Sequence, residues 1–432
     1  MLWPNMAING IASQLGIENS ITQRPSLEFQ YYQGINSVMY QRTVSDPQHQ
    51  LVNFLAGVSN MTGMFTIENI DDLTDADYIP KFNRGRRAFL SKETQDKIRD
   101  MYNKSDFMLT TTEYLRDAFC RCYGVDKSNV ICIPNYLPRW WIDDKINIPF
   151  NVERFRRNKK RLRIGIVSSL SHYNIDGIRQ SAEGLAVYDI KDPHGQVVGY
   201  IDEKGRKISK EDGEKLPLVE DDLDMLIDLI TKTVDKYCWV FFGYKPPKLA
   251  HFIDQGKIEY HPGVPITNYP SVLYRAQLNL IVAPCLDNEF NRCKSNIKYL
   301  EACALGVPLI ASRIAPTYTK YVPDQHLFSS AGELEQILNK FADMSAGLYQ
   351  KKIEAQWKWL NSPHCDCGIP APNWWLEDCL DPWVRLWRMR SKAMHISLKK
   401  HIESRQQAEL RRQLEDSQKE KIFSEDGLEI MK

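Results

Sequence analysis

The stretch Ile281–Ser312, IVAPCLDNEFNRCKSNIKYLEACALGVPLIAS, predicts a strand, a helix and a second strand in succession. Leu278–Pro284 and Val307–Ala311 are apolar runs of strand length, and a polar loop and an amphipathic helix separate them. Ligands of open α/β sheets bind in loops at the carboxyl ends of strands. The stretch therefore predicts an α/β fold with a candidate site in the loop that precedes the helix.

The predicted helix has an apolar face and a polar side. Its apolar residues recur at helical spacing: Ile297, Leu300, Ala304 and Leu305. Near the helix start, Lys294, Ser295 and Asn296 combine a positive charge, a hydroxyl and free backbone N–H groups, which suits a phosphate. Glu301 could accept hydrogen bonds from the hydroxyls of a sugar or ribose. The alternative is that Glu301 and Lys298 form only a solvated pair.

The residues from Lys294 to Ser312 also resemble a known motif. The string Lys-Ser-Asn-x-Lys-x-x-Glu-Ala-x-Ala-Leu-Gly-x-Pro-x-Ile-Ala-Ser is similar to the nucleotide-sugar-binding segment of GT-B glycosyltransferases. It looks most like the family-4-type enzymes and their bacteriophage relatives. The resemblance implies an α/β fold of GT-B type, with two Rossmann-like domains facing a cleft and with carboxyl-terminal helices. It also implies a nucleotide-diphosphate sugar as donor, a UDP sugar by preference, and no obligatory metal.

Length and composition fit a globular protein of two domains. The 432 residues suffice for two separate cores, and the hydrophobic fraction of 43% is ordinary. The formal net charge is +1, so no overall basic field indicates nucleic acid. No apolar run approaches the roughly 20 residues of a membrane span, and Met1–Met6 lacks the pattern of a secretory signal. We expect a cytoplasmic protein, in a bacterial host if a phage encodes it.

The ten cysteines include no Cys-x-x-Cys pair. The closest pairs are Cys120 with Cys122 and Cys365 with Cys367, and neither comes with the second half of a zinc site. The spacing therefore predicts reduced thiols and no metal site.

Changes of pattern along the chain predict four parts. Residues 1–150 predict an amino-terminal Rossmann-like acceptor domain, and residues 151–345 predict a second one for the nucleotide sugar. Prolines and a basic run between residues 138 and 163 predict a linker. Residues 346–395 are rich in tryptophan and predict return helices that pack across both domains, and residues 396–432 predict a charged helical tail. Within the second domain, residues 187–208 predict an inserted β-hairpin.

Acidic side chains follow the predicted strand Met64–Asn69. If the sheet is parallel, Asp71 and Asp72 would project into the same cleft as the loop before Lys294. An Asp after a strand commonly caps a turn and does nothing more. The functional alternative is that one carboxylate contacts the acceptor hydroxyl or acts as its base, and the resemblance to the phage enzymes favours that alternative.

Two basic runs flank the predicted cleft. The first is Lys81–Arg87, KFNRGRR, and the second is Arg154–Arg161, RFRRNKKR. Each could be solvated surface, or each could hold phosphates of an acceptor. The cations of the phosphate hypothesis are Lys81, Arg84, Arg86, Arg87, Arg156 and Arg157.

The resemblance assigns the donor to several loops. It implies that Ser169 and His172 bind the diphosphate and that the nucleotide base lies against Gly263 and Val264. Lys294 would stabilise the charge that grows on the leaving diphosphate. Glu301 would hold the ribose.

One position departs from the family pattern. Family-4 enzymes carry a sugar-contacting glutamate eight positions before the ribose-binding one, and this chain has Cys293 there. Asn291, Lys294 and Ser295 are expected to take over the contact with the donor sugar. Sugar identity, stereochemical outcome and oligomeric state stay open.

The acceptor is predicted from the phage-like motif and the two basic runs. Together they favour double-stranded DNA bearing 5-hydroxymethylcytosine, whose modified base would have to leave the stack. The first alternative is transfer to a cell-surface glycan or a protein. The second is a non-catalytic nucleotide-binding module that keeps the fold without the activity.

Overall fold

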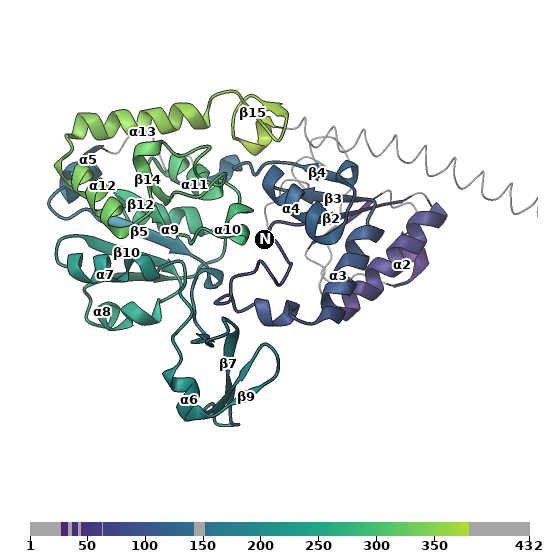
Figure 1. Ribbon diagram of the computed structural model, residues 1–432. Helices are drawn as coiled ribbons and strands as arrows, with labels where there is room; N and C mark the ends of the chain where they lie inside the picture. The colour runs from purple at the N-terminus through teal and green to yellow at the C-terminus, as the bar shows by residue number, and fades with distance from the viewer. Residues whose placement is uncertain (1–26, 33–36, 42–44, 63, 142–151, 380–432) are drawn as a thin grey trace, which may run out of the picture.

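The computed structural model describes residues 27–32, 37–41, 45–62, 64–141 and 152–379. Its amino-terminal part is built on one parallel sheet (Figure 1). The strands lie in chain order: β1 (Ser37–Gln41), β2 (Phe65–Asn69), β3 (Phe107–Thr110) and β4 (Val130–Cys132). The helices of this part are α2 (Asp46–Thr62), α3 (Lys92–Lys104) and α4 (Glu113–Tyr123).

The second part is built on a six-stranded parallel sheet. In chain order its strands are β5 (Arg163–Ser168), β10 (Cys238–Gly243), β11 (Glu259–Pro262), β12 (Leu280–Ala283), β13 (Leu309–Ser312) and β14 (Leu327–Phe328). Their spatial order is β11-β10-β5-β12-β13-β14, which is 3-2-1-4-5-6 when counted from β5. This is the doubly wound order, and its ligand site lies where the order reverses, between the first and fourth strands. The predicted α/β class with two Rossmann-like parallel sheets is confirmed.

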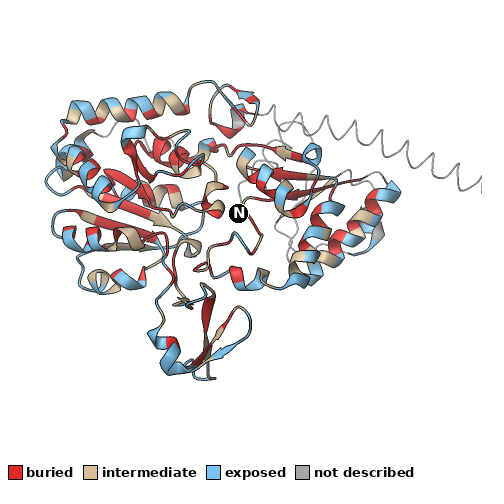
Figure 2. Cartoon of the chain, in the orientation of Figure 1, coloured by how far each residue is buried: buried red, intermediate tan, exposed pale blue. Residues whose placement is uncertain are grey.

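Both faces of the six-stranded sheet are buried (Figure 2). Along β10, Trp239 and Phe241 pack into one cluster of core residues, while Val240 and Phe242 pack into another. Alternation between two apolar layers explains why β10 reads as a continuous hydrophobic run. The helices of this part are α7 (Asp224–Thr233), α8 (Ala250–Asp254), α9 (Tyr269–Arg275), α10 (Glu289–Arg292), α11 (Ile297–Leu305) and α12 (Ala331–Asp343).

The insertion is larger than the predicted hairpin. It is an antiparallel sheet of β6 (Arg179–Gln180), β7 (Ala186–Lys191), β8 (Val197–Asp202) and β9 (Lys207–Ile208), followed by α6 (Lys210–Lys215). Tyr188 and Ala186 of β7 share an apolar cluster with Phe82 of the amino-terminal part. The insertion therefore joins the second part of the chain to the first, below the two large sheets in Figure 1.

A carboxyl-terminal segment makes a second connection. α13 (Ala346–Leu360) packs against α5 (Val152–Asn158) and α11, and a hairpin of β15 (His364–Asp366) and β16 (Ile369–Ala371) follows. Leu137 donates its N–H to the carbonyl of Trp374, and Leu376 donates to the carbonyl of Leu137. Both indoles at positions 374 and 375 are buried, in keeping with a packing role. Trp383, Trp387 and the predicted tail lie outside the described residues.

The predicted linker is partly a helix. Residues 142–151 lie outside the described residues, but α5 includes the first half of the basic run. Arg154 is 3% exposed and donates to the carbonyl of Gly306 at 3.2 Å, and Phe155 is fully buried. The solvated-linker interpretation is therefore wrong for these two residues, because α5 docks them beneath the six-stranded sheet.

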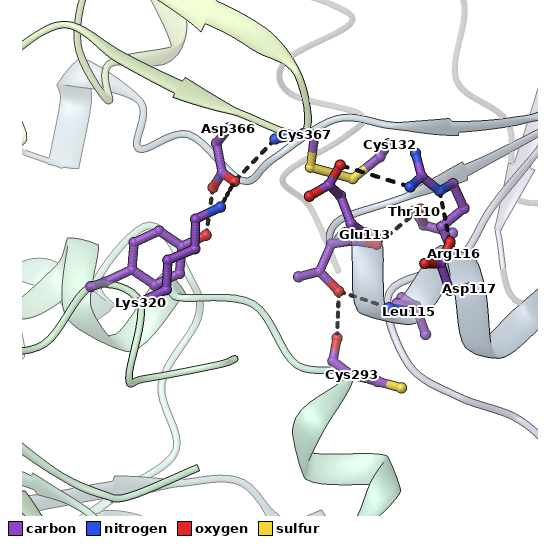
Figure 3. The surroundings of a disulfide bond; sticks show 12 residues. Thr110, Glu113, Leu115, Arg116, Asp117, Cys132, Cys293, Lys320, Asp366 and Cys367 are labelled. Atoms are coloured by element: carbon purple, nitrogen blue, oxygen red, sulfur yellow. Dashed lines mark hydrogen bonds and ion pairs between the residues drawn. A yellow bond between two sulfur atoms is a disulfide. The ribbon is translucent and has the colours of Figure 1, made fainter. Parts of the chain in front are cut away.

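The prediction that the cysteines are all reduced thiols is also wrong. Cys132, at the end of β4, and Cys367, between β15 and β16, form a disulfide (Figure 3). The bridge spans 235 residues of sequence, a separation at which spacing carries no information about pairing. Cys120, Cys122 and Cys365 are free. Across the described ranges, no helix is both long and apolar enough to cross a membrane.

Candidate functional site

A cavity of about 250 Å³ lies where the carboxyl edges of the two large sheets face each other. Residues after β5, β12 and α10 line one side, and residues at the ends of β1 to β4 line the other. The first side coincides with the switch point between β5 and β12. From that side come Ser168, His172, Cys285, Lys294, Lys298 and Glu301; from the other come Gln41, Asn69, Asp71, Asp72, Thr111 and Asn135.

Lys294 lies between the two sides of the cavity. Its side chain is 20% exposed, its Nζ is 3.6 Å from Asp72 Oδ1, and the ammonium stands 4.7 Å above the ring of Phe290. Burial opposes the charged form, but nearby Asp72, Cys285 and Asp222 outweigh it and raise the pKa of Lys294. The cavity wall therefore carries a positive charge at Lys294.

His172 is oriented by a buried aspartate that sequence patterns did not single out. Its Nδ1 is 2.7 Å from Oδ2 of Asp222, which is 2% exposed. Since a carboxylate only accepts, Nδ1 carries the hydrogen and Nε2 keeps its lone pair. Burial and the charge of Lys294 hold the pKa of His172 below its usual range, although Asp222 opposes this shift. A neutral ring in this tautomer offers an acceptor, which suits a hydroxyl better than a phosphate.

Asp222 organises the loop after β12 as well. Its Oδ1 accepts from the backbone N–H of Leu286 at 2.7 Å and from Nδ2 of Asn291 at 3.0 Å. Asn291 is 2% exposed and also donates to the carbonyl of Leu286. Its amide thus holds the loop in shape and does not line the cavity, contrary to the predicted contact with a donor sugar. The pair Asp221-Asp222 at a helix start was the available signal, but such residues are usually caps.

Cys293 lies in the core of the amino-terminal part. It is 0% exposed and packs with Phe290 among residues of α3 and α4, and its carbonyl accepts from Thr112 Oγ1 at 3.0 Å. Glu289 accepts from Tyr114 Oη at 2.7 Å and pairs with Arg121. The segment that would carry a sugar-contacting glutamate therefore docks α10 onto α4.

Helix α11 is more deeply buried than its sequence suggests. All residues from Tyr299 to Leu305 are buried, and Glu301 is 7% exposed, so the alternative of a solvated pair with Lys298 is wrong. Glu301 Oε2 accepts from Tyr269 Oη at 3.2 Å and lies 3.4 Å from Lys298 Nζ. This carboxylate lines the cavity, and its two hydrogen-bonding contacts are long, so they satisfy only part of its capacity to accept hydrogen bonds.

The remaining residues that were predicted to bind the donor substrate do not all line the cavity. Ser295 lines the cavity and accepts from Asn135 Nδ2 at 2.6 Å. Asn296 is 3% exposed and precedes α11, outside the cavity wall. Ser169 is exposed and contacts Ser171, whereas its neighbour Ser168 lines the cavity. Gly263 and Val264 are exposed after β11 and do not border the cavity.

The basic run Lys81–Arg87 serves mainly to dock the insertion. Lys81 donates to the carbonyl of Gly184, and Arg87 stands 5.3 Å from the ring centroid of Tyr188. Arg86 is 7% exposed and pairs with Glu203 at 2.8 Å. Arg84 lies 3.5 Å from Asp176. These contacts argue against the predicted grip on phosphates, because Arg84 and Arg86 already have carboxylate partners, and Lys81 and Arg87 already contact the insertion.

Arg156 and Arg157 are exposed on α5, and Arg156 pairs with Glu153. Neither borders the cavity.

One group of described residues has donor atoms close enough to share a metal ion. His172, Asp222 and Cys285 offer ligand atoms within 4.8 Å of one another. In the structure, however, Nδ1 of His172 and both oxygens of Asp222 are used in hydrogen bonds to each other and to the β12 loop. The group therefore acts as a polar network.

Comparisons with known proteins found distant structural similarity to glycosyltransferases and a UDP-bound protein. No family model matches the chain, and no curated protein matches it. Anabaena Alr3699/HepE in complex with UDP is 12% identical, with a TM-score of 0.46 over 81% of this chain and 85% of that chain. A glycosyltransferase from Rickettsia africae ESF-5 is 10% identical, with a TM-score of 0.47 over 89% and 88%. TarM of S. aureus is 15% identical, with a TM-score of 0.47 over 83% and 57%. Similarity this low says nothing about substrate.

Proposed function

We propose that the protein is a glycosyltransferase that uses a nucleotide-diphosphate sugar, a UDP sugar by preference, and a hydroxyl-bearing acceptor. The observation that carries the proposal is the charge of Lys294 at the switch point of the doubly wound sheet, facing the polar edge of a second parallel sheet. The resemblance of residues 294–312 to the nucleotide-sugar-binding motif supports it.

The described side chains divide the work of the reaction. Lys294, with Lys298 beside it in the cavity wall, would stabilise the charge on the leaving diphosphate. Nε2 of His172 would accept a hydrogen bond from a hydroxyl of the donor sugar. Glu301, with two long contacts only, would accept hydrogen bonds from the ribose. Asp222 would keep His172 in one tautomer and in one orientation.

Of the acceptors considered from the sequence, a glycan is favoured over DNA. The hypothesis of a hydroxymethylcytosine acceptor relied on two basic runs, and Lys81, Arg86 and Arg87 of the first run contact the insertion instead. The cavity wall formed by the amino-terminal sheet carries Asp71 and Asp72 and no cation among the residues that line it from β1 to β4. Hydroxymethylated DNA stays an alternative to be tested.

The test measures release of nucleotide from radiolabelled UDP sugars by the full chain and by variants. Lys294→Met should lower turnover about 10²–10³-fold, because it removes charge stabilisation where the leaving group forms. Lys248→Met is the matched control, since Lys248 pairs with Asp224 outside the cavity wall and its loss should leave turnover unchanged. Equal turnover of Lys294→Met and wild type would contradict the leaving-group role. If wild type consumes no UDP sugar, the non-catalytic module is the better description.

A further inference from the structure

The carboxyl edge of the amino-terminal sheet presents neutral polar side chains to the cavity. Gln41 ends β1, Asn69 ends β2, and Thr111 follows β3 directly. Register places Gln41 beside Asn69 and Asn69 beside Leu109, two residues before Thr111, so the three residues lie at the same edge of the sheet. All three line the cavity.

Each of these side chains contains a buried polar atom without a hydrogen-bond partner in the part of the chain that the structure describes. The atoms are Nε2 of Gln41, Nδ2 of Asn69 and Oγ1 of Thr111. Asn69 as a whole is only 5% exposed. Folded proteins pair nearly all buried polar groups, and an unpaired one costs its desolvation free energy. Three such atoms in one wall of one cavity indicate a ligand that supplies the missing partners.

The chemistry of the wall restricts that ligand. Amides and hydroxyls both donate and accept, as the hydroxyl groups of a sugar do. Asp71 and Asp72 border the same edge, and Asp72 lies 3.6 Å from Lys294, so this edge supplies no positive charge that would attract phosphates or other anions. Lys294 and Lys298 lie in the opposite wall, where the proposed function puts the donor diphosphate. An uncharged, hydroxyl-rich molecule fits the amino-terminal wall best.

We propose that Gln41, Asn69 and Thr111 bind the acceptor and that the acceptor is an uncharged carbohydrate. This inference rests on the proposed function for the reaction, but the binding that it describes can be measured without turnover. Asp71 and Asp72 stand next to the bound sugar, where either could accept a hydrogen bond from its hydroxyls.

Two isosteric variants separate a binding role from a structural one. Thr111→Val and Asn69→Leu keep the shape of the side chain and remove a group that has no partner to lose, so they should leave the melting temperature unchanged or raise it. The KM for the acceptor should rise about tenfold for each, as expected when one hydrogen bond to the ligand is lost. Thr66→Val is the matched control in the same sheet. Thr66 Oγ1 contacts Asp106 at 2.8 Å, so this variant should melt earlier with an unchanged acceptor KM.

Saturation-transfer NMR tests the binding directly, with methyl hexosides and neutral trisaccharides as probes on the full chain in the presence of UDP. Transfer to a neutral sugar that weakens in Thr111→Val and Asn69→Leu supports the inference. No transfer to any of them, or transfer equal in wild type and both variants, overturns it. Label from a UDP sugar entering hydroxymethylated duplex DNA and no neutral glycan would also overturn it. Sugar binding without any consumption of UDP sugars would instead contradict the proposed function and leave this inference standing.

Discussion

At the scale of single residues, Lys294 contributes to the low pKa of its neighbour His172. Burial is the larger reason for the low pKa of His172, and the ammonium of Lys294 is the next. In Lys294→Met the pKa of His172 should therefore rise, whereas Lys294→Arg keeps the charge and should leave it nearly unchanged. Titration of the His172 ring protons by NMR measures this. A pKa that moves equally in both variants would mean that packing, and not charge, links the two residues.

The same shift makes stability depend on pH. Because the folded state holds the pKa of His172 below the unfolded value of about 6.5, the folded protein favours the neutral ring. The contribution of His172 to stability is fully present above pH 6.5 and is lost progressively as the pH falls below it, since the unfolded chain then binds the proton first. Urea unfolding between pH 5 and 8 should show this loss in wild type and less of it in His172→Gln.

Residue roles were only partly predictable from the sequence. Lys294, His172, Ser295 and Glu301 were named from a local motif and a loop, and the structure brings all four to one cavity. Asp222 was not named, because its partners come from loops 50 and 69 positions away in sequence. Local patterns contain no signal for such contacts.

At the scale of elements, α10 is the helix whose packing the motif did not predict. Sequence periodicity gave the strands and α11 closely, since their apolar runs are long enough to show a period. α10 has four residues, too few to show a helical period. Its apolar side chains pack in the core of the amino-terminal part, whereas the elements before and after it in sequence belong to the second part. The basic run Lys81–Arg87 was misjudged for a related reason, because charge in sequence does not show which carboxylates lie opposite.

Because α10 docks onto the amino-terminal part, loss of its apolar contact should change how the two parts are arranged. Phe290 is 5% exposed and packs within the core of the amino-terminal part. Phe290→Ala should therefore reduce the free energy of the contact between the two parts by about 3–5 kcal/mol. Small-angle X-ray scattering should then show a larger radius of gyration. Phe54→Ala is the control, since Phe54 packs within the amino-terminal part against α2 neighbours and should lower stability without opening the molecule. An unchanged radius in Phe290→Ala would show that α10 does not hold the parts together.

At the scale of the whole molecule, two sheets face each other, and contacts of several segments join them. Alternating strands and helices predicted parallel sheets, because parallel strands need crossover helices. The facing of the two sheets across a cleft was implied by the resemblance to GT-B glycosyltransferases, and the strand order comes from the structure. The connection through the carboxyl-terminal segment was predicted from its tryptophans, but those through the insertion and α10 were not. The insertion, α10 and the segment around Trp374 each bridge the parts through contacts between residues distant in sequence.

The bridge through the insertion includes a buried ion pair. Arg86 and Glu203 are 9% and 10% exposed, and Arg86 also donates to the carbonyls of Ala76 and Ile79. Removing one partner leaves a buried charge without compensation, so Arg86→Met or Glu203→Gln should each cost about 3–5 kcal/mol in urea unfolding. The double variant should lose less than the sum, because neither charge is then left alone. Arg156→Gln, at an exposed pair with Glu153, should change stability by less than about 1 kcal/mol. Additive losses in the double variant would show that the two side chains stabilise the molecule independently, and the insertion would then be held by its apolar cluster.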